Sequence, residues 1–127
     1  MAGSPQFRLL RENKLLNAAA FSRVFKKATR SRDKWFTVLC RKNETNEARL
    51  GLAISKKNCR LASGRNRIKR LVRESFRLHQ TELAGLDIVV MNQPAARQAG
   101  NQVLVASMAA HWQSCTKATH EENAQDD

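Results

Sequence analysis

The segment from residue 65 to residue 83 constrains the fold more than any other part of the sequence. Apolar side chains recur in it at a spacing that places them on one side of an α-helix: Ile68, Leu71, Val72 and Phe76. We therefore expect a helix from Arg65 to Leu83, with Ser63 as a candidate N-cap. A helix with a single apolar side must bury that side, so the rest of the chain has to supply a surface for it to pack on.

The opposite side of this helix is basic. At about 100° per residue, four side chains fall within an arc of roughly 60°, and Lys69 flanks them. We call these four the arginine stripe: Asn66, Arg70, Arg73 and Arg77. A solvated charged face is the alternative interpretation, but such a face normally mixes signs to form i, i+4 pairs. Like charges stacked on one face favour a polyanionic ligand, because guanidinium groups bind phosphates bidentately and stack on bases.

The charge of the whole chain supports a nucleic-acid partner. The formal net charge is +12. Residues 1–77 hold 21 of the 23 Lys and Arg against five acids, whereas residues 78–127 hold two against six. The first part therefore carries +16 and the second −4. A field this lopsided favours fast, salt-sensitive association with a polyanion.

The hydrophobic pattern of the rest of the chain predicts further helices and strands. We expect a first helix with Asn17 as its N-cap, three strands and a last helix: Leu15–Ala28, Trp35–Arg41, Arg49–Ser55, Leu86–Met91 and Gln102–Cys115. The first two strands are separated by a polar turn and predict an antiparallel hairpin. The resulting order is α-β-β-α-β-α, an α+β sandwich of a sheet with helices packed on it.

We expect one domain over residues 8–116, after a flexible N-terminus (1–7) and before a disordered acidic tail (117–127). No stretch approaches the roughly 20 apolar residues that span a bilayer, and no apolar signal-peptide core is present. The three cysteines, at positions 40, 59 and 115, match neither a disulfide framework nor a zinc pattern. Reduced thiols in a cytoplasm are the simplest interpretation.

Aromatic side chains are the second candidate feature. Phe21 and Phe25 lie one helical turn apart in the basic part of the chain. Periodicity favours a core position for both, and stacking on unpaired bases is the alternative. Trp35 and Phe36 point to opposite faces of their strand, so at most one of them belongs to the core of a one-sided sheet.

No catalytic constellation is visible in the sequence. His79 and His111 fall on apolar helix faces and are expected to be core or rim residues, and His120 lies in the acidic tail. The scattered carboxylates suggest no metal cage. We therefore expect no catalytic or metal site in this chain.

Two stretches closely resemble the bacterial ribonuclease P protein family: Arg65–Arg77 (RNRIKRLVRESFR) and Leu50–Lys57 (LGLAISKK). The resemblance extends from about Arg8 to Trp112. It implies the α-β-β-α-β-α fold, similar to domain 2 of ribosomal protein S5, with a left-handed βαβ crossover against the usual rule. Two features depart from the family pattern, a last helix poor in basic residues and the acidic tail.

The resemblance also implies a function. The protein would be the subunit of an endoribonuclease in which the RNA subunit carries the active site and its Mg²⁺ ions. It would bind that RNA and the 5′ leader of precursor tRNA, promoting removal of the leader. No membrane and no obligate protein partner are expected, and the cytoplasm is the expected location.

By match to the family, the residues that contact the RNA subunit are Lys56, Lys57, Arg60, Arg65, Asn66, Arg67, Lys69, Arg70, Arg73 and Arg77. The residues implied for the 5′ leader are Phe21, Phe25, Lys26, Trp35, Phe36 and Ser55.

Two other functions compete with this one. The first is a non-catalytic RNA-binding module of ribosomal or RNA-chaperone type, which would bind RNA without stimulating leader removal. The second is a protein nuclease acting alone, which needs a carboxylate cluster or a pair of catalytic histidines that the sequence does not offer.

Overall fold

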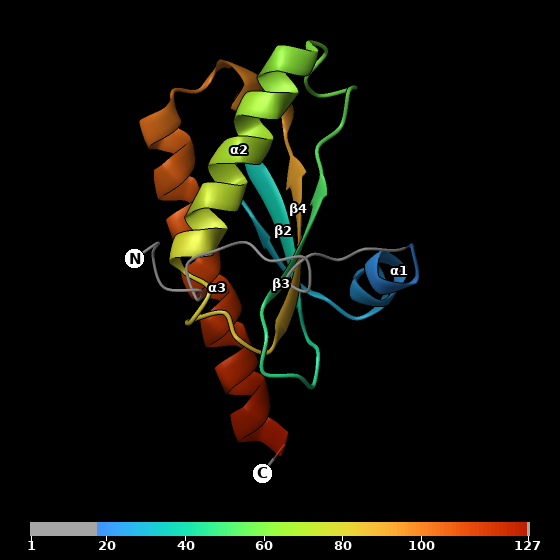
Figure 1. The fold of residues 1–127 in the computed structure, drawn as a ribbon. Helices are drawn as coiled ribbons and strands as arrows, with labels where there is room; N and C mark the ends of the chain where they lie inside the picture. Colours follow the sequence, from blue (N-terminus) through green and yellow to red (C-terminus); the bar gives the residue numbers. More distant parts are fainter. Residues whose placement is uncertain (1–17, 127) are drawn as a thin grey trace, which may run out of the picture.

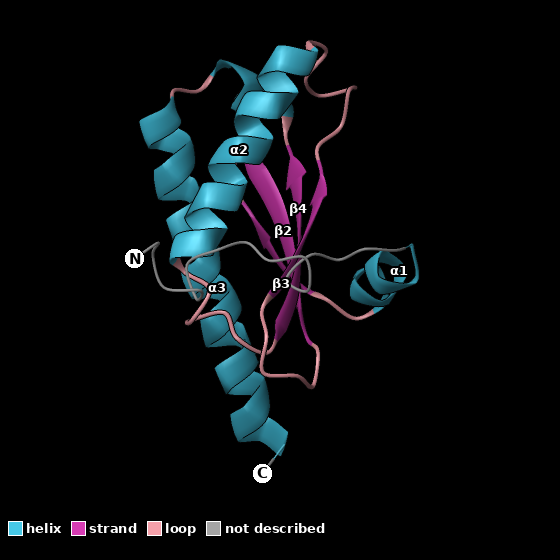
Figure 2. Ribbon diagram, in the orientation of Figure 1, coloured by secondary structure: helices cyan, strands magenta, loops and turns pink. Residues whose placement is uncertain are grey.

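The computed structural model describes the backbone of residues 18–126 and the side chains of residues 21–119. The predicted flexible N-terminus (1–7) and the predicted N-cap Asn17 lie outside these residues. The elements are α1 (Ala18–Lys26), β1 (Thr29–Arg32), β2 (Phe36–Lys42), β3 (Arg49–Ala53), α2 (Ala62–Leu78), β4 (Leu86–Asn92), the 3₁₀ helix η3 (Pro94–Gln98) and α3 (Asn101–Asp126) (Figures 1 and 2).

The four strands form one mixed sheet in the order β1-β2-β4-β3. β2 pairs antiparallel with β1 and with β4, whereas β3 pairs parallel with β4. The predicted hairpin between β2 and β3 is therefore wrong, because β4 lies between them. β4 occupies a central position since nearly all of its residues are buried on both faces, which an edge strand cannot achieve.

β1 is a strand that the sequence analysis missed, so the order of elements has one strand more than predicted. Its sequence, Thr-Arg-Ser-Arg, carries no apolar residue, and its burial alternates between partly buried and exposed. A polar strand of four residues at the sheet edge gives no hydrophobic signal, and it is stabilised by its ladder to β2.

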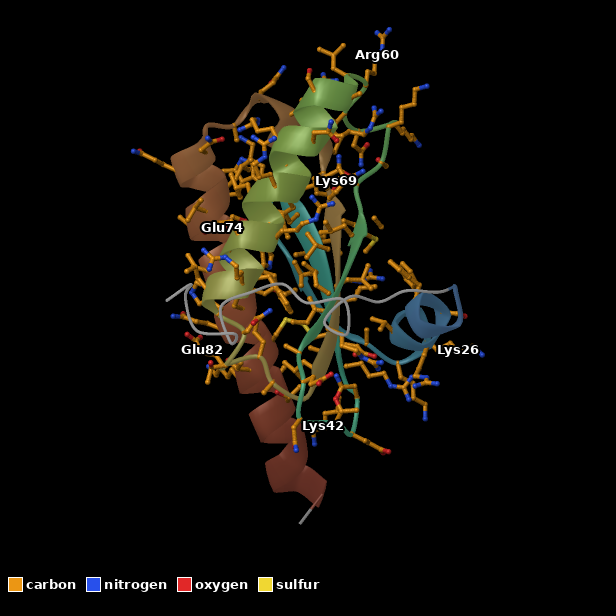
Figure 3. All side chains as sticks on the ribbon, viewed as in Figure 1. Lys26, Lys42, Arg60, Lys69, Glu74 and Glu82 are labelled. Carbon is orange, nitrogen blue, oxygen red and sulfur yellow. A yellow bond between two sulfur atoms is a disulfide. The ribbon has the colours of Figure 1, made fainter. Side chains whose placement is uncertain are left out.

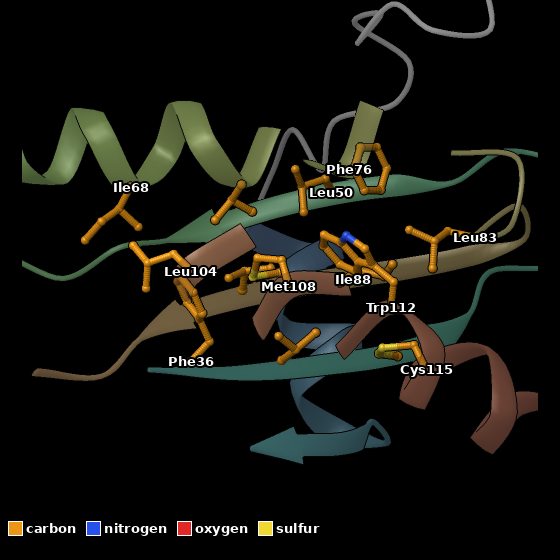
Figure 4. Close-up of a cluster of buried hydrophobic side chains, with 14 of the residues drawn as sticks. Phe36, Leu50, Ile68, Phe76, Leu83, Ile88, Leu104, Met108, Trp112 and Cys115 are labelled. Carbon is orange, nitrogen blue, oxygen red and sulfur yellow. A yellow bond between two sulfur atoms is a disulfide. The ribbon is translucent and has the colours of Figure 1, made fainter. Parts of the chain in front are cut away.

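α2 and α3 pack together on one face of the sheet and enclose the larger core (Figures 1 and 4). The predicted apolar side of α2 is confirmed, since Ile68, Val72 and Phe76 are fully buried and Leu71 is partly buried. α3 contributes Leu104, Met108 and Trp112, which are also fully buried. The indole Nε1 of Trp112 donates to the hydroxyl of Ser75 across the helix pair at 2.8 Å. This bond satisfies two polar groups inside the core, where an unpaired group is costly.

α1 packs on the opposite face of the sheet, where Val24, Leu39 and Val89 form a smaller cluster (Figure 1). Strand alternation explains the division, because successive side chains of β2 point to opposite faces. The sheet is thus covered by two helices on one face and by a single short helix on the other, which confirms the α+β class. The hand of the β3-α2-β4 crossover stays a prediction.

The helix boundaries differ from those predicted. α2 begins at Ala62, with Leu61 in the N-cap position, so Ser63 lies inside the helix. It ends at Leu78 rather than Leu83, and the chain then turns through Gly85, whose positive φ of 86° suits glycine.

α3 extends to Asp126 rather than ending near Cys115, so residues 117–126 are helical where a disordered tail was predicted. Thr119, at the start of that segment, is buried, and its hydroxyl donates to the carbonyl oxygen of Cys115 at 3.0 Å. The acidic, weakly apolar sequence of this segment favoured disorder, and the continuation of the helix was therefore not predicted.

The structure joins Cys40 of β2 to Cys115 of α3 in a disulfide, with Cα atoms 5.9 Å apart, and leaves Cys59 as a buried free thiol. The prediction of three reduced thiols is wrong for this pair. The two cysteines are 75 residues apart in sequence, and only the packing of α3 on β2 brings them together. Within residues 18–126, no helix is long and apolar enough to cross a membrane.

Candidate RNA-binding surface

The arginine stripe lies on the outward side of α2. Ile68, Val72 and Phe76 face the core, which turns Asn66, Arg70 and Arg73 to solvent, and all three are exposed. Figure 3 shows Lys69 on α2 and Arg60 beyond its N-terminal end. The periodicity argument is therefore confirmed as to which side of the helix faces outward.

Arg77, the last member of the stripe, forms an ion pair with Glu74 one turn earlier. The hydrogen bond from Arg77 lowers the pKa of the Glu74 carboxyl, and the same bond raises the pKa of the guanidinium. Glu74 is the only acidic residue of α2, so this ion pair offsets part of the positive charge of the helix. Arg70 and Arg73 therefore carry most of the positive field of the stripe.

Arg65 and Arg67 lie beside the stripe and bind their own chain. Arg65 Nη1 donates to the carbonyl oxygens of Cys59 and Arg60, at 2.9 and 2.8 Å. Arg67 Nη1 donates to Asn101 Oδ1 at 2.6 Å, and its Nη2 donates to the carbonyl oxygen of Ala99 at 3.0 Å. Both side chains are partly buried, so part of each guanidinium still faces outward.

The basic loop before α2 presents exposed cations at Lys56, Lys57 and Arg60. Asn92, at the end of β4, holds this loop. Its Oδ1 accepts from the backbone N–H of Ser55 at 2.7 Å, and its carbonyl oxygen accepts from Asn58 Nδ2 at 2.8 Å.

A close contact also fixes the start of α2 against this loop. A Cβ atom added at Gly64 would come within 2.8 Å of Cys59 Sγ. Glycine permits this approach, and the loop cations thereby keep a defined position relative to the arginine stripe.

The residues implied for the 5′ leader are divided between the two faces of the sheet. On α1, Phe25 is 50% exposed, Lys26 is exposed, and Phe21 packs partly buried against the small cluster. The core position that periodicity favoured for both phenylalanines is thus wrong for Phe25. Figure 3 shows Lys26 on the far side of the sheet from α2.

Phe36 is fully buried in the larger core, beneath α2 and α3, and Trp35 packs against that same core. Phe36 alone of the pair is fully buried, but Trp35 packs against the same core, so the prediction that the two point to opposite faces is not confirmed. A fully buried Phe36 has no surface for a leader, so its assignment to a leader surface is wrong. The sequence allowed either face for Phe36, and the packing of α3 decided it. Ser55 accepts from the backbone N–H of Asn58 at 3.1 Å and so helps to hold the basic loop.

Sequence reasoning missed two cations on the α1 face. Arg30 and Arg32 pair with Leu39 and Thr37 of β2, and Leu39 points toward α1. Both arginines are exposed. The alternation in Thr-Arg-Ser-Arg was the available signal, but it is too short to be read as a strand.

His111 and His79 occupy the core and rim positions expected of them. His111 is 3% exposed; its Nδ1 lies 2.7 Å from Ser31 Oγ, and its Nε2 lies 3.0 Å from Asp33 Oδ2. His79 Nδ1 lies 2.8 Å from the carbonyl oxygen of Ser75. Among the described residues, no group of three His, Cys, Asp or Glu side chains could hold a metal ion.

Asp33 ties the turn before β2 to α3. Burial raises the pKa of its carboxyl, but hydrogen bonds from Ser107 and from the backbone N–H groups of Phe36 and Trp35 outweigh that effect. The net result is a pKa below the usual value. These hydrogen bonds give Asp33 a role in stabilising the fold.

A small α+β domain that presents a basic helix and a basic loop has the features of the class of RNA-binding proteins. The family model for ribonuclease P matches residues 9–116. The ribonuclease P protein component of Methylococcus capsulatus is 47% identical over 107 residues, 84% of each chain. That of Thioalkalivibrio sulfidiphilus is 46% identical over 102 residues, 80% of this chain and 85% of the relative.

Solved structures agree with the sequence relatives. The Staphylococcus aureus RNase P protein superposes with a TM-score of 0.72 at 30% identity, over 77% of this chain and 90% of that one. The Thermotoga maritima protein gives 0.66 at 28% identity, over 83% and 92%. The chain therefore belongs to the bacterial ribonuclease P protein family. As such a component it is part of the ribonuclease P holoenzyme and associates with the RNase P RNA.

Proposed function

We propose that this chain binds RNA within the holoenzyme through two opposite faces of its sheet. The outward-facing residues of α2 and of the basic loop bind the RNA subunit, namely the partly buried Lys69 and the exposed Lys56, Lys57, Arg60, Asn66, Arg70 and Arg73. Arg65, Arg67 and Arg77 support that face through contacts within the chain and add their remaining exposed surface.

The α1 face binds the 5′ leader of precursor tRNA. Phe25 offers an exposed ring for stacking on an unpaired base, and Lys26, Arg30 and Arg32 offer cations for the adjoining phosphates. One observation carries this proposal: α1 and α2 cover opposite faces of a single sheet, so one rigid domain can hold two RNA segments at once (Figure 1).

The catalytic step stays with the RNA in this proposal, together with the magnesium ions that it requires. The protein adds leader contacts and offsets phosphate repulsion, so cleavage proceeds at a lower magnesium concentration. We place this activity in the cytoplasm.

The test is single-turnover cleavage of a precursor tRNA by bacterial ribonuclease P RNA at limiting magnesium, with and without the protein. We expect a large stimulation, with the cut at the mature 5′ end. Tight RNA binding without stimulation would instead favour a general RNA-binding module.

A further inference from the structure

A pocket of about 360 Å³ lies between α2 and the first turns of α3. Its lining combines apolar and polar side chains: Arg67, Arg70, Leu71, Glu74, Ser75, Leu78, His79, Asn101 and Val105. We call it the α2–α3 groove. Two of its apolar side chains are large and exposed, Leu78 at 55% and Val105 at 48%. Exposed apolar surface gathered at a concave site marks a place where something binds.

The groove is continuous with the arginine stripe. Arg70 belongs to the stripe and also lines the groove. At about 100° per residue, Glu74, Leu78 and Leu71 follow Arg70 around the helix toward α3. A ligand on the stripe therefore reaches the groove without crossing any other element.

The charged groups of the lining leave Arg70 available. Arg67 binds Asn101 Oδ1 and two backbone carbonyl oxygens, and Glu74 is paired with Arg77. Arg70 is exposed and has no hydrogen bond or ion pair within the described part of the chain. The groove thus has an apolar interior with one available guanidinium at its edge.

His79 adds a directional polar group. Its Nδ1 lies 2.8 Å from the carbonyl oxygen of Ser75, which can only accept, so Nδ1 carries the proton. In the neutral ring, Nε2 is then an acceptor. Ser75 itself is engaged at the back of the groove, where its hydroxyl accepts from Trp112.

We propose that the α2–α3 groove takes one unstacked nucleobase of the RNA subunit. Leu78 and Val105 contact the base, His79 Nε2 accepts from an N–H on its edge, and Arg70 binds the neighbouring phosphate. This inference rests on the proposed binding of the RNA subunit by α2. It adds a base contact on α3, a helix with only one basic residue among positions 101–119.

Charge argues for RNA rather than a second copy of this chain in the groove. A second copy of this chain would bring a net charge of +12 against the arginine stripe. RNA supplies both parts that the site requires, a phosphate for Arg70 and a flat, largely apolar base for the groove.

The experiment measures affinity for bacterial ribonuclease P RNA at several salt concentrations, using the full chain and the variants Leu78→Ser and Val105→Ser. Val103→Ser is the matched control, since Val103 is 41% exposed on the same helix but does not line the groove. Melting curves check that each variant is folded. We expect Kd to rise about tenfold for the groove variants, the loss typical of one stacked base. The salt slope should stay unchanged, because no phosphate contact is lost.

A second readout uses the unmutated protein, so it does not depend on variant folding. RNA containing 4-thiouridine is crosslinked to the protein, which is then digested with trypsin. We expect crosslinks on the peptides 78–97 or 98–117, which carry the two walls of the groove beyond the stripe.

Three outcomes would overturn the proposal. The groove variants could bind as tightly as Val103→Ser, the crosslinks could stay within residues 56–77, or the unmutated protein could form a dimer that Val105→Ser abolishes. If the unmutated protein itself fails to bind the RNA, the proposed function fails instead, and the same titration reports that.

Discussion

Arginines that lie within one short motif have different roles in this protein. Arg65 and Arg67 bind backbone carbonyl oxygens of the loop before α2 and of the segment before α3. Arg70 and Arg73 are exposed on the outer side of the helix. Because a guanidinium carries five N–H donors, the first two can support the surface and still reach a ligand. Substitutions should separate the two roles.

Arg70→Ala or Arg73→Ala should weaken binding to the RNA subunit and reduce the salt slope by about one each. The reason is the loss of a phosphate contact with its released counterions. A filter-binding titration from low to high salt measures both quantities. Unchanged affinity and slope in both variants would remove the arginine stripe from RNA binding.

Arg67→Ala should instead destabilise the fold. It removes charged donors from Asn101 and from the carbonyl oxygens of Ala96 and Ala99, which lowers the free energy of unfolding by about 1–2 kcal/mol. Urea denaturation measures the loss, with Arg73→Ala as the control. Equal stability of these two variants would contradict the anchoring role.

Phe25→Ala tests the α1 face. The ring is half exposed, so its loss should cost little stability and should weaken binding of a leader-bearing precursor more than of mature tRNA. Holoenzyme affinities for the two RNAs give the comparison, and a melting curve shows whether packing was lost. An equal effect on both RNAs in a stable variant would argue against leader stacking.

At the scale of elements, polar contacts attach the sheet edge to α3. Ser31 is hydrogen-bonded to His111, and Asp33 accepts from Ser107 and lies beside His111. The short strand β1 and the turn after it are therefore held by α3 as well as by β2. The disulfide between Cys40 and Cys115 adds a covalent link between α3 and the same part of the sheet.

Asp33→Asn tests this attachment through pH. The folded-state pKa of Asp33 lies below the usual 3.8, so its stabilising contribution is complete above that value and disappears as pH falls through the folded-state pKa. The variant should therefore be less stable than the unmutated protein at pH 7, and the difference should shrink below about pH 4. Thermal melts from pH 7 to pH 3 provide the check. A difference that does not change with pH would exclude the charge of Asp33 as its cause.

At the scale of the whole molecule, the sheet separates two basic faces. The basic residues of α1 and β1 lie on one face, and those of the basic loop and α2 lie on the other. Packing rather than charge holds the two faces together, since the larger core lies between the sheet and α2. Two RNA segments can then be held at a constant separation.

Local patterns in the sequence were enough to predict which residues share a helix face, and with it the arginine stripe on α2. Such patterns also predicted the buried strand β4, the preference for a polyanionic partner and the family, because all of these depend on local periodicity or on motifs within one segment. The helix ends and the helical continuation of α3 gave no such local signal, and the alternation in the polar edge strand β1 was too short to be recognised.

Strand pairing and side-chain contacts could not be predicted in this way, because they join distant parts of the chain. β4 lies between β2 and β3, and a local pattern does not specify such a non-local partner. The same holds for the burial of Phe36 beneath α3, for the anchoring of Arg67 on Asn101, and for the Cys40–Cys115 pair. Each depends on residues far away in the sequence that meet only when the core forms.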